Sequence, residues 1–420
     1  MTSQLVAVSS LLLGSAFLLI AGGIHGILLP VQGSVVGFSI TELGLLGTSW
    51  SAGYVAGCFL IPNMVRRAGH VRTYGAMGSI AAVTILLNAL LVTPWVWIPL
   101  RAVTGFAFAG AAMVVESWLN ERASRENRGT LFSVYQMVNY GASTAGQLML
   151  AIRPPSQDFF YAIGAIFYCL AVLPTALSTA KTPQPIKQAS LDVRRLYAIS
   201  PVGAVVAFLI GLVNGAFGTL GPVYGQKIGL AVSDIAMMMA GAVLGGSLIQ
   251  YPLGRLSDRM DRRRVLIGVC AGAIVVGLAI AAFHPRAALV VTILAIIFGA
   301  MIYPTYALTV AHANDFAGPD EFVKVASSLL VLYGFGCMIG PIGASVAMER
   351  IAPEGMFIFT ALVQIVIIGY VAYRISQRPE PNRVLREQFQ AIAEPKTTTP
   401  ETATLDPRSS PPAAPPASEA

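Results

Sequence analysis

The chain is divided by short polar stretches into twelve apolar runs, each about twenty residues or longer. The runs cover residues 9–31, 41–63, 72–93, 95–119, 130–152, 159–180, 199–224, 232–253, 265–284, 286–311, 323–347 and 355–376. About 20 apolar residues wound as an α-helix match the roughly 30 Å hydrocarbon core of a bilayer. Soluble proteins carry about 25% charged residues, whereas this chain carries 11%. The runs therefore predict an all-α polytopic membrane protein with twelve transmembrane helices.

The lysines and arginines are distributed unevenly between the runs. With the N-terminus placed inside, 22 of the 27 basic residues fall in cytoplasmic segments, four fall in external loops, and Arg101 falls inside a run. Helical membrane proteins concentrate Lys and Arg on the cytoplasmic side. We therefore expect both termini in the cytoplasm. Because the basic residues lie in short patches between apolar runs, the net charge of +7 does not predict nucleic-acid binding.

The longest internal polar segment divides the runs into two sets of six. Residues 1–180 are assigned to an N-terminal six-helix bundle, residues 181–198 to a cytoplasmic linker, and residues 199–376 to a C-terminal six-helix bundle. The last segment, residues 377–420, is polar and rich in proline. A segment of this composition cannot bury a core, so a disordered cytoplasmic tail is expected.

The two halves repeat each other at a constant offset of 192 residues. The matched pairs are Pro30 with Pro222, Gly37 with Gly229, Glu42 with Asp234, Gly53 with Gly245, and Arg67 with Arg259. Since six helices separate equivalent positions, the halves are parallel repeats related by an axis along the membrane normal. This duplication is typical of transporters that work by alternating access.

Three motifs resemble one transporter family. The charged stretch GRLSDRMDRRR, from Gly254 to Arg264, is similar to the loop motif of the major facilitator superfamily. RAVTG, from Arg101 to Gly105, resembles its fourth-helix motif, and VVESWLNERASRENRG, residues 114–129, resembles the YcaD-like group of bacterial transporters. The resemblance covers about residues 9–376. It implies the major facilitator fold, a bacterial inner membrane location and transport of a small solute; a monomer is expected.

The resemblance also implies a conformational latch, in which Asp258 and its basic neighbours hold helix ends together. The predicted latch residues are Arg67, Gly254, Arg255, Asp258, Arg259 and Arg262. The offset of 192 places Arg66 opposite Asp258, so the first half lacks the acid and the latch should be asymmetric. Glu116 lies near the cytoplasmic end of its run. An inner-gate ion pair with a neighbouring arginine is expected for it, with a proton site as the alternative.

Arg101 and His25 are the other main ionisable candidates inside the runs, where a charge costs about 2.5–3.5 kcal/mol at a helix centre. By resemblance, Arg101 assists proton coupling; otherwise it is a structural arginine bonded to backbone carbonyls. His25 lies between glycines in GGIHGIL. Imidazole titrates near neutral pH, so His25 could carry the coupling proton. The alternative is a buried neutral histidine bonded to a neighbouring helix.

Polar side chains follow one face of the fifth run. Spacings of three and four place them together on a helix, and they are Gln136, Asn139, Tyr140, Ser143 and Gln147. The stripe could line an aqueous cavity or bond helices to one another. Asn214, Tyr303 and Tyr306 could complete the opposite wall. An aromatic cavity lined by amides and few charges suits a neutral or weakly charged aromatic solute.

Together these features predict a secondary active, proton-coupled transporter that takes up an aromatic metabolite such as a riboflavin-like vitamin. A multidrug or metabolite exporter working as a proton antiporter is the first alternative, and a transporter-like receptor without flux is the second. Drug antiporters of the superfamily carry a Gly-Pro motif on the fifth helix, and Gln147 stands here in place of the proline. No enzyme motif, metal-ligand spacing or cofactor motif is present in the sequence, so no catalytic residue, metal or cofactor is predicted.

Overall fold

The computed structural model describes residues 2–124, 127–152, 158–177, 191–318, 321–377, 389–392, 397–406 and 408–409. Within these ranges all regular structure is helical, which confirms the predicted all-α class. The helices are α1 (Thr2–Val35), α2 (Ile40–Ala68), α3 (His70–Leu90), α4 (Pro94–Arg122), α5 (Arg128–Met149), α6 (Phe159–Ala176), α7 (Val193–Ile199), α8 (Pro201–Lys227), α9 (Val232–Arg259), α10 (Arg262–Phe283), α11 (Ala288–Ile302), α12 (Pro304–Asn314), α13 (Phe322–Arg350), α14 (Gly355–Gln377) and α15 (Thr402–Leu405).

Eleven helical stretches in the described ranges are long and apolar enough to cross a membrane. One of them joins α11 and α12 into a single stretch, Ala288–Asn314. The twelfth helix of the bundle, α5, has 22 residues, and its polar stripe lowers its hydropathy. The predicted count of twelve is therefore reached with α5, while α7 is a short helix in the predicted linker.

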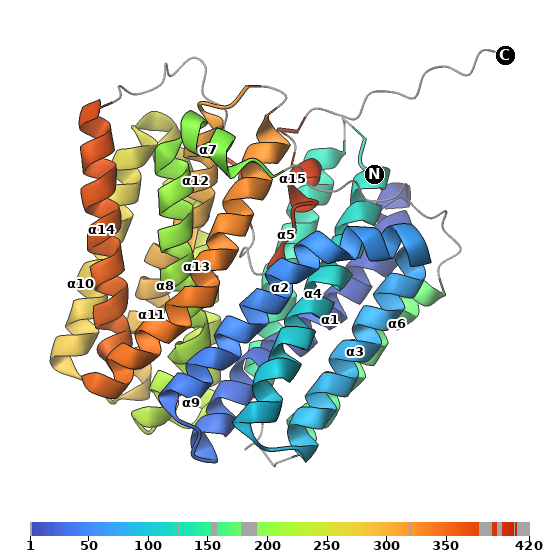
Figure 1. Ribbon diagram of the computed structural model, residues 1–420, viewed down its shortest axis with the longest axis horizontal. Coiled ribbons are helices and arrows are strands. Elements are labelled where there is room, and N and C mark those ends of the chain that lie inside the picture. The colour runs from blue at the N-terminus through green and yellow to red at the C-terminus, as the bar shows by residue number, and fades with distance from the viewer. Residues whose placement is uncertain are drawn as a thin grey trace.

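The helices form two bundles that lie side by side, α1–α6 and α8–α14 (Figure 1). Equivalent helices begin at equivalent residues, since α2 starts at Ile40 and α9 at Val232, 192 positions later. Gly37 and Gly229, also 192 apart, both adopt positive φ, at 93° and 87°. Glycine alone takes this conformation without strain. The sequence repeat is thus a repeat of structure down to single turns.

Several hydrogen bonds join the two bundles toward the end that carries the α1–α2 and α8–α9 turns, called here the far end. Ser34 Oγ donates to Gln226 Oε1 at 2.6 Å. These residues are equivalent in the repeat, so their contact lies close to the axis that relates the halves. The Thr41 amide donates to Glu349 at 2.8 Å, and the Thr48 hydroxyl donates to the Met338 carbonyl at 2.7 Å. The halves are therefore joined at the far end.

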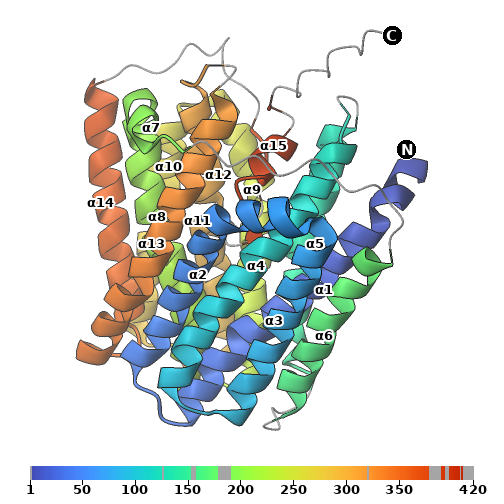
Figure 2. The ribbon, with the colours of Figure 1, turned by 45° about the vertical axis from the view of Figure 1, so that its right-hand side comes forward.

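The opposite end of the bundle carries the arginine-rich α2–α3 and α9–α10 loops and is called here the basic end. Described parts of the predicted tail lie at this end, and α15 lies between the two bundles (Figures 1 and 2). Thr398 and Thr399 are only 2% and 1% exposed. These residues are packed rather than exposed, because Tyr54 and Glu116 of the first bundle bind this threonine-rich stretch. Residues 378–388 of the tail and 181–190 of the linker lie outside the described ranges.

Candidate functional site: the cavity between the halves

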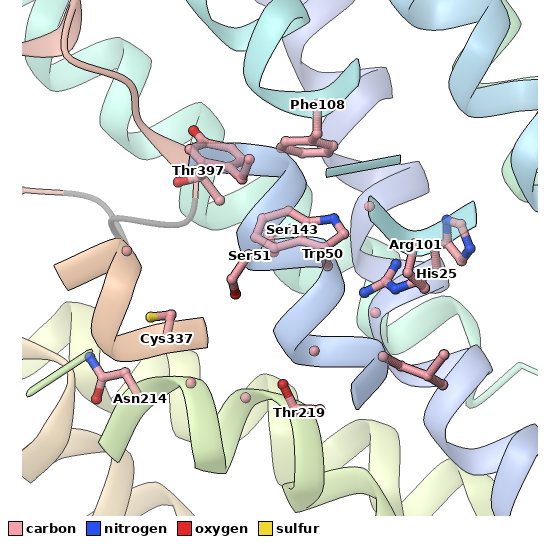
Figure 3. Close-up of a pocket in the computed structure, with 18 of the residues that line it drawn as sticks. His25, Trp50, Ser51, Arg101, Phe108, Ser143, Asn214, Thr219, Cys337 and Thr397 are labelled. Atoms are coloured by element: carbon pink, nitrogen blue, oxygen red, sulfur yellow. The ribbon is translucent and has the colours of Figure 1, made fainter. Parts of the chain in front are cut away.

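A cavity lies between the two bundles (Figure 3). Side chains from both halves line it, and its polar and aromatic lining residues are His25, Trp50, Ser51, Tyr54, Arg101, Phe108, Ser143, Gln147, Tyr168, Asn214, Thr219, Tyr333 and Thr397. The halves are joined by hydrogen bonds at the far end, and Thr397 of the tail borders the cavity. Ligand sites of transporters of this architecture lie between the repeats.

Aromatic rings form one wall of the cavity. Trp50 and Tyr54, one turn apart on α2, stack with ring centroids 5.1 Å apart and planes inclined by 27°. The ring of Phe108 on α4 lies 6.0 Å from that of Trp50. Flat side chains of this kind offer stacking surfaces to a ring in a ligand.

Arg101 is the charged residue of the cavity wall. It lies on α4, is 9% exposed, and its guanidinium carbon is 6.0 Å from the centroid of the Trp50 ring. No carboxylate of the described residues pairs with it, no acidic residue lines the cavity, and its Nε has no hydrogen-bond partner. A buried unpaired charge is costly. The side chain therefore has capacity to bind an electron-rich group of a ligand, and no contact supports the alternative of an arginine anchored on backbone carbonyls.

His25 lies beside Arg101 in the same wall (Figure 3). Its Nε2 is 3.1 Å from Asn88 Nδ2, and its Nδ1 is 3.4 Å from the hydroxyl oxygen of Tyr168. These contacts from α3 and α6 are those expected for a buried histidine bonded to neighbouring helices. Because the ring also lines the cavity, its role as a proton carrier stays a prediction.

Amide side chains from both halves line the cavity, and several of their nitrogen and oxygen atoms have no hydrogen-bond partner in the protein. Both amide atoms of Asn214, on α8, and Oε1 of Gln147, on α5, have no protein partner although both residues are buried. Buried polar groups are nearly always hydrogen-bonded. These atoms are therefore candidates for contact with a ligand.

The polar stripe of α5 divides into two parts. Ser143 and Gln147 line the cavity, whereas Tyr140 accepts a 2.6 Å hydrogen bond from Gln250 on α9, in the other half. Gln136 and Asn139 are buried but do not line the cavity. The stripe thus both lines the cavity and bonds the two halves together, which were the two predicted alternatives.

Tyr303 and Tyr306 do not lie where the sequence suggested, because neither lines the central cavity. Tyr303 lies near Phe217, with ring centroids 6.5 Å apart. Tyr306 packs edge-on against Tyr333 at 5.0 Å and lines a second, smaller groove that tail residues border. Tyr333 and Thr219, rather than these tyrosines, join Asn214 in the second-half wall.

Glu116 lies on α4 and is fully buried. Tyr135 donates its hydroxyl to Glu116 Oε1 at 3.0 Å, and the Thr399 amide and hydroxyl of the tail donate to Oε2. The expected ion pair is not found, since no arginine of the described residues pairs with Glu116. Arg122 instead stacks over Trp118 at 5.0 Å.

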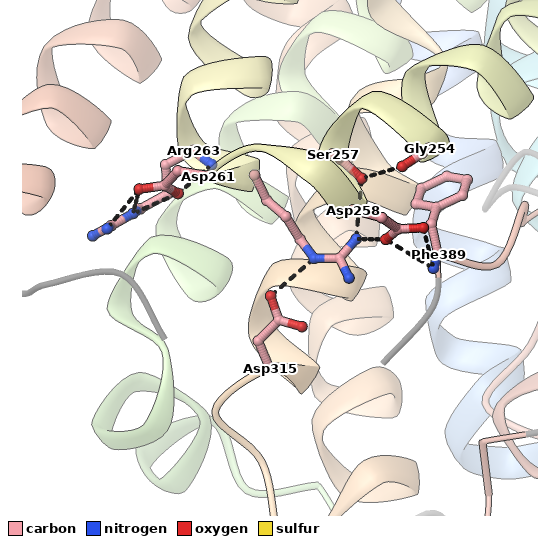
Figure 4. A network of polar contacts seen from close by, with 8 residues as sticks. Gly254, Ser257, Asp258, Asp261, Arg263, Asp315 and Phe389 are labelled. Carbon is pink, nitrogen blue, oxygen red and sulfur yellow. Dashed lines mark hydrogen bonds and ion pairs between the residues drawn. The ribbon is translucent and has the colours of Figure 1, made fainter. Parts of the chain in front are cut away.

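The charged α9–α10 loop forms a buried network (Figure 4). Arg262 is 2% exposed and contacts Asp258 at 3.1 Å, Asp315 at 2.9 Å and Ser257 at 3.0 Å. The network joins α9, α10 and the end of α12, which all belong to the second half. Asp258 also accepts from the Phe389 amide of the tail at 3.1 Å.

The other predicted latch residues lie around this network. A side chain at Gly254 would collide with Phe389, since a Cβ there would lie 2.1 Å from its ring. Arg67, Arg255 and Arg259 are exposed at the basic end. In the first half, Arg66 contacts Asn63 at 3.1 Å in place of the Asp258 ion pair.

The sequence repeat, the Ser34–Gln226 contact near the axis and the central cavity are all features of one transporter fold. A comparison with protein families decides to which family the chain belongs. The model of the Major Facilitator Superfamily matches residues 11–313 and 203–414. The chain belongs to the major facilitator superfamily. This multi-pass major facilitator is therefore a membrane transporter and not an enzyme, as predicted.

Relatives and solved structures cover most of this major facilitator. It is 26% identical over 375 residues to the uncharacterised MFS-type transporter YcaD of Salmonella typhi, which covers 88% of this chain and 96% of the relative. The predicted resemblance to the YcaD group is thus confirmed. The nucleoside transporter NupG is 15% identical with a TM-score of 0.71, over 87% of this chain and 96% of NupG. A bacterial homologue of the human lysosomal transporter Spinster, solved inward-facing and occupied, is 16% identical with a TM-score of 0.69, over 90% and 97%. These two structures share the fold.

Several residues of the site escaped the sequence analysis. Phe108 and Tyr168 carry no signal of their own, because aromatic residues are common in membrane helices. Gln250 is a lone amide within an apolar run and could have been noticed. The threonines of KTTTPETATL differ from the proline-rich end of the tail, which was the available signal for Thr399.

Proposed function

We propose that this major facilitator is a secondary active, proton-coupled transporter that takes up a small aromatic solute across the bacterial inner membrane. The observation that carries the proposal is the cavity between the halves, where stacked rings, an unpaired guanidinium and unpartnered amides face one space. The positive-inside rule supports a cytoplasmic location for the basic end. The far-end contacts then correspond to closure toward the outside.

The cavity favours a flat, neutral or weakly acidic heteroaromatic solute. Trp50 and Phe108 provide surfaces for ring stacking. The amide of Asn214 can both donate and accept, and Arg101 can donate to a ring carbonyl or a weakly acidic group. A riboflavin-like vitamin combines a fused ring, ring carbonyls and hydroxyl groups, which matches these demands.

Two buried ionisable side chains along the path are candidates for the coupling proton. His25 lies in the cavity wall, and Glu116 lies between the cavity and the basic end. Among the described residues, neither is held in an ion pair with a group of opposite charge. Each can therefore gain or lose a proton without breaking a salt bridge, and ionisable residues within membrane spans often mark proton pathways.

Transport by the purified protein in proteoliposomes tests the proposal. We expect riboflavin, or another heteroaromatic from a panel of vitamins and aromatic acids, to accumulate when a pH gradient, with the acidic side outside, is imposed. Substitution Asn214→Ala should weaken this uptake, whereas Gln364→Ala, a buried amide away from the cavity, should leave it intact. Accumulation that is independent of every ion gradient would rule out proton coupling.

The same vesicles separate the alternatives. Solute binding with no flux under any gradient would support a receptor. Flux that is driven only outward, together with resistance of cells to the compound, would support an exporter.

A further inference from the structure

The basic end of the cavity is occupied by the chain's own C-terminal segment. The described residues of this segment, 389–392, 397–406 and 408–409, contact both bundles. Its first-half partners are Tyr54, Glu116, Arg128 and Tyr140, and its second-half partners are Gln250 and Asp258. A segment that touches both halves bridges the surfaces that must separate in an alternating-access cycle.

The deepest contacts are made by three consecutive threonines. Thr397 borders the central cavity. The carbonyl of Thr398 accepts a 2.7 Å hydrogen bond from the hydroxyl of Tyr54, a residue of the aromatic wall. The amide of Thr399 donates to Glu116 Oε2 at 3.2 Å, and its hydroxyl donates to the same oxygen. Both hydrogen-bond donors of Thr399 therefore bind one buried carboxyl group, so Glu116 is the principal receptor for the segment.

A second set of contacts recognises the backbone near Ile392. Its carbonyl accepts from the Tyr140 hydroxyl at 2.9 Å and from Gln250 Nε2 at 3.2 Å, while its amide donates to Gln250 Oε1 at 3.1 Å. Phe389 adds an amide bond to Asp258. Because Tyr140 and Gln250, from opposite halves, both bind the Ile392 carbonyl, the groove is suited to an extended peptide rather than to a small solute.

The geometry points to an intramolecular plug: we infer that the described C-terminal residues, 389–392, 397–406 and 408–409, bind the groove at the basic end, close the central cavity there and must leave before solute is exchanged. This inference goes beyond the proposed transport activity, since it holds for any solute. The segment is within reach, because α14 ends at Gln377 and eleven residues precede Phe389. Eleven extended residues span up to about 36 Å.

The reactivity of native thiols tests the plug without a solute. Cys58 and Cys337 line the cavity. In protein with Cys169→Ser and Cys270→Ser, a membrane-impermeant maleimide is applied in turn to each face of reconstituted vesicles. A chain ending at residue 388 lacks the plug, and a chain ending at residue 409 keeps it and is the matched control. We expect at least tenfold faster labelling of the two thiols after the first truncation and unchanged labelling after the second. A synthetic peptide of residues 389–409 should restore protection.

A full-length variant guards against misfolding of the truncated chain. Thr399→Asp places a second carboxylate against Glu116 and should expel the segment, so labelling should rise as it does after truncation. Ser418→Asp adds the same charge beyond residue 409 and should change nothing. If Thr399→Asp labels at the full-length rate from both faces, the plug is refuted. The labelling experiment does not depend on a solute. The plug can therefore be refuted while transport of an aromatic solute is confirmed, and the plug can be confirmed while that transport is refuted.

Discussion

At the scale of single residues, the sequence identified ionisable and amide side chains but not their surroundings. Arg101, His25, Gln147 and Asn214 were selected because polar residues in apolar runs are rare, and all four line the cavity. The expected arginine partner of Glu116 was wrong, because the partner comes from the tail, 283 residues away. A polar residue within an apolar run is therefore a candidate functional residue. Its bonding partner, however, is set by packing between segments that are far apart in the chain.

Asn214→Ala should weaken solute binding without harming the fold. The amide makes no protein hydrogen bond, so its removal breaks none in the empty protein. A lost hydrogen bond to the ligand costs about 1–2 kcal/mol, so the apparent affinity should fall about 5- to 30-fold. Transport kinetics or equilibrium binding with the identified solute measures this. Unchanged affinity would exclude Asn214 from the binding site.

Glu354 provides a prediction for acid stability at the far end. Burial disfavours its charged form, but hydrogen bonds from Arg286 at 2.7 Å and His284 at 3.3 Å outweigh burial and hold the pKa of the carboxyl below its usual value. The folded pKa lies below the unfolded one, so the contribution to stability is present above about pH 4.3 and is lost as pH falls further.

Glu354→Gln should therefore lower the melting temperature at pH 7 and flatten its decline in acid. Arg286 is half exposed, so screening limits the loss at neutral pH to about 1 kcal/mol. Thermal unfolding in detergent between pH 3.5 and 7 measures both effects. A variant whose acid decline parallels that of the unaltered protein would contradict the assignment.

At the scale of elements, the apolar runs predicted every membrane helix, but not where the helices end or break. The run 41–63 became α2, which continues to Ala68 because arginines are good helix formers and lie beyond the apolar layer. The run 286–311 is divided at Tyr303, since Pro304 supplies no backbone N–H to continue the ladder. Pro304 could have predicted the break from the sequence. The extension of α2 beyond the apolar layer could not be predicted from hydropathy, because it contains two arginines.

Arg262 joins three of these elements, and its loss should be the most damaging change in the charged loop. Arg262→Ala leaves the carboxylate of Asp315, which is 2% exposed, without its arginine. Breaking a buried pair costs about 3–5 kcal/mol. Arg255→Ala removes only an exposed contact with the Tyr251 ring and should cost less than about 1 kcal/mol. Equal melting temperatures for the two variants would show that the Arg262 network does not contribute to the stability of the fold.

At the scale of the whole molecule, the repeat determines how the halves meet. The offset of 192 residues predicted parallel halves, and the contact between Ser34 and Gln226 lies near their common axis. The closure of the far end and the plug at the basic end did not follow from the repeat. Both depend on how the two halves are oriented relative to each other, and a sequence repeat does not determine that orientation.

A disulfide across the far end should arrest the transport cycle. A Cβ on Gly44 would lie 3.0 Å from the Cβ of Ser345, in the other half, which is close to the 3.5–4.5 Å that a disulfide requires. With the native cysteines replaced, Gly44→Cys with Ser345→Cys should lose transport on oxidation and regain it with reductant. Gly57→Cys with Ala109→Cys is the matched control, since those Cβ atoms would lie 2.8 Å apart within the first half. Transport that survives the first crosslink would mean that the far end need not open.

The sequence by itself determined the membrane helices, their pairing into two parallel halves and most of the polar residues of the cavity. These features depend on hydrophobicity, periodicity and a constant offset, which are properties of the order of residues along the chain. Only the tertiary structure decided that Tyr303 lies outside the cavity wall, that Glu116 binds Thr399, and that the tail lies between the halves. Such contacts join segments far apart in the chain, and they are fixed by shape and hydrogen-bond geometry that no local pattern encodes.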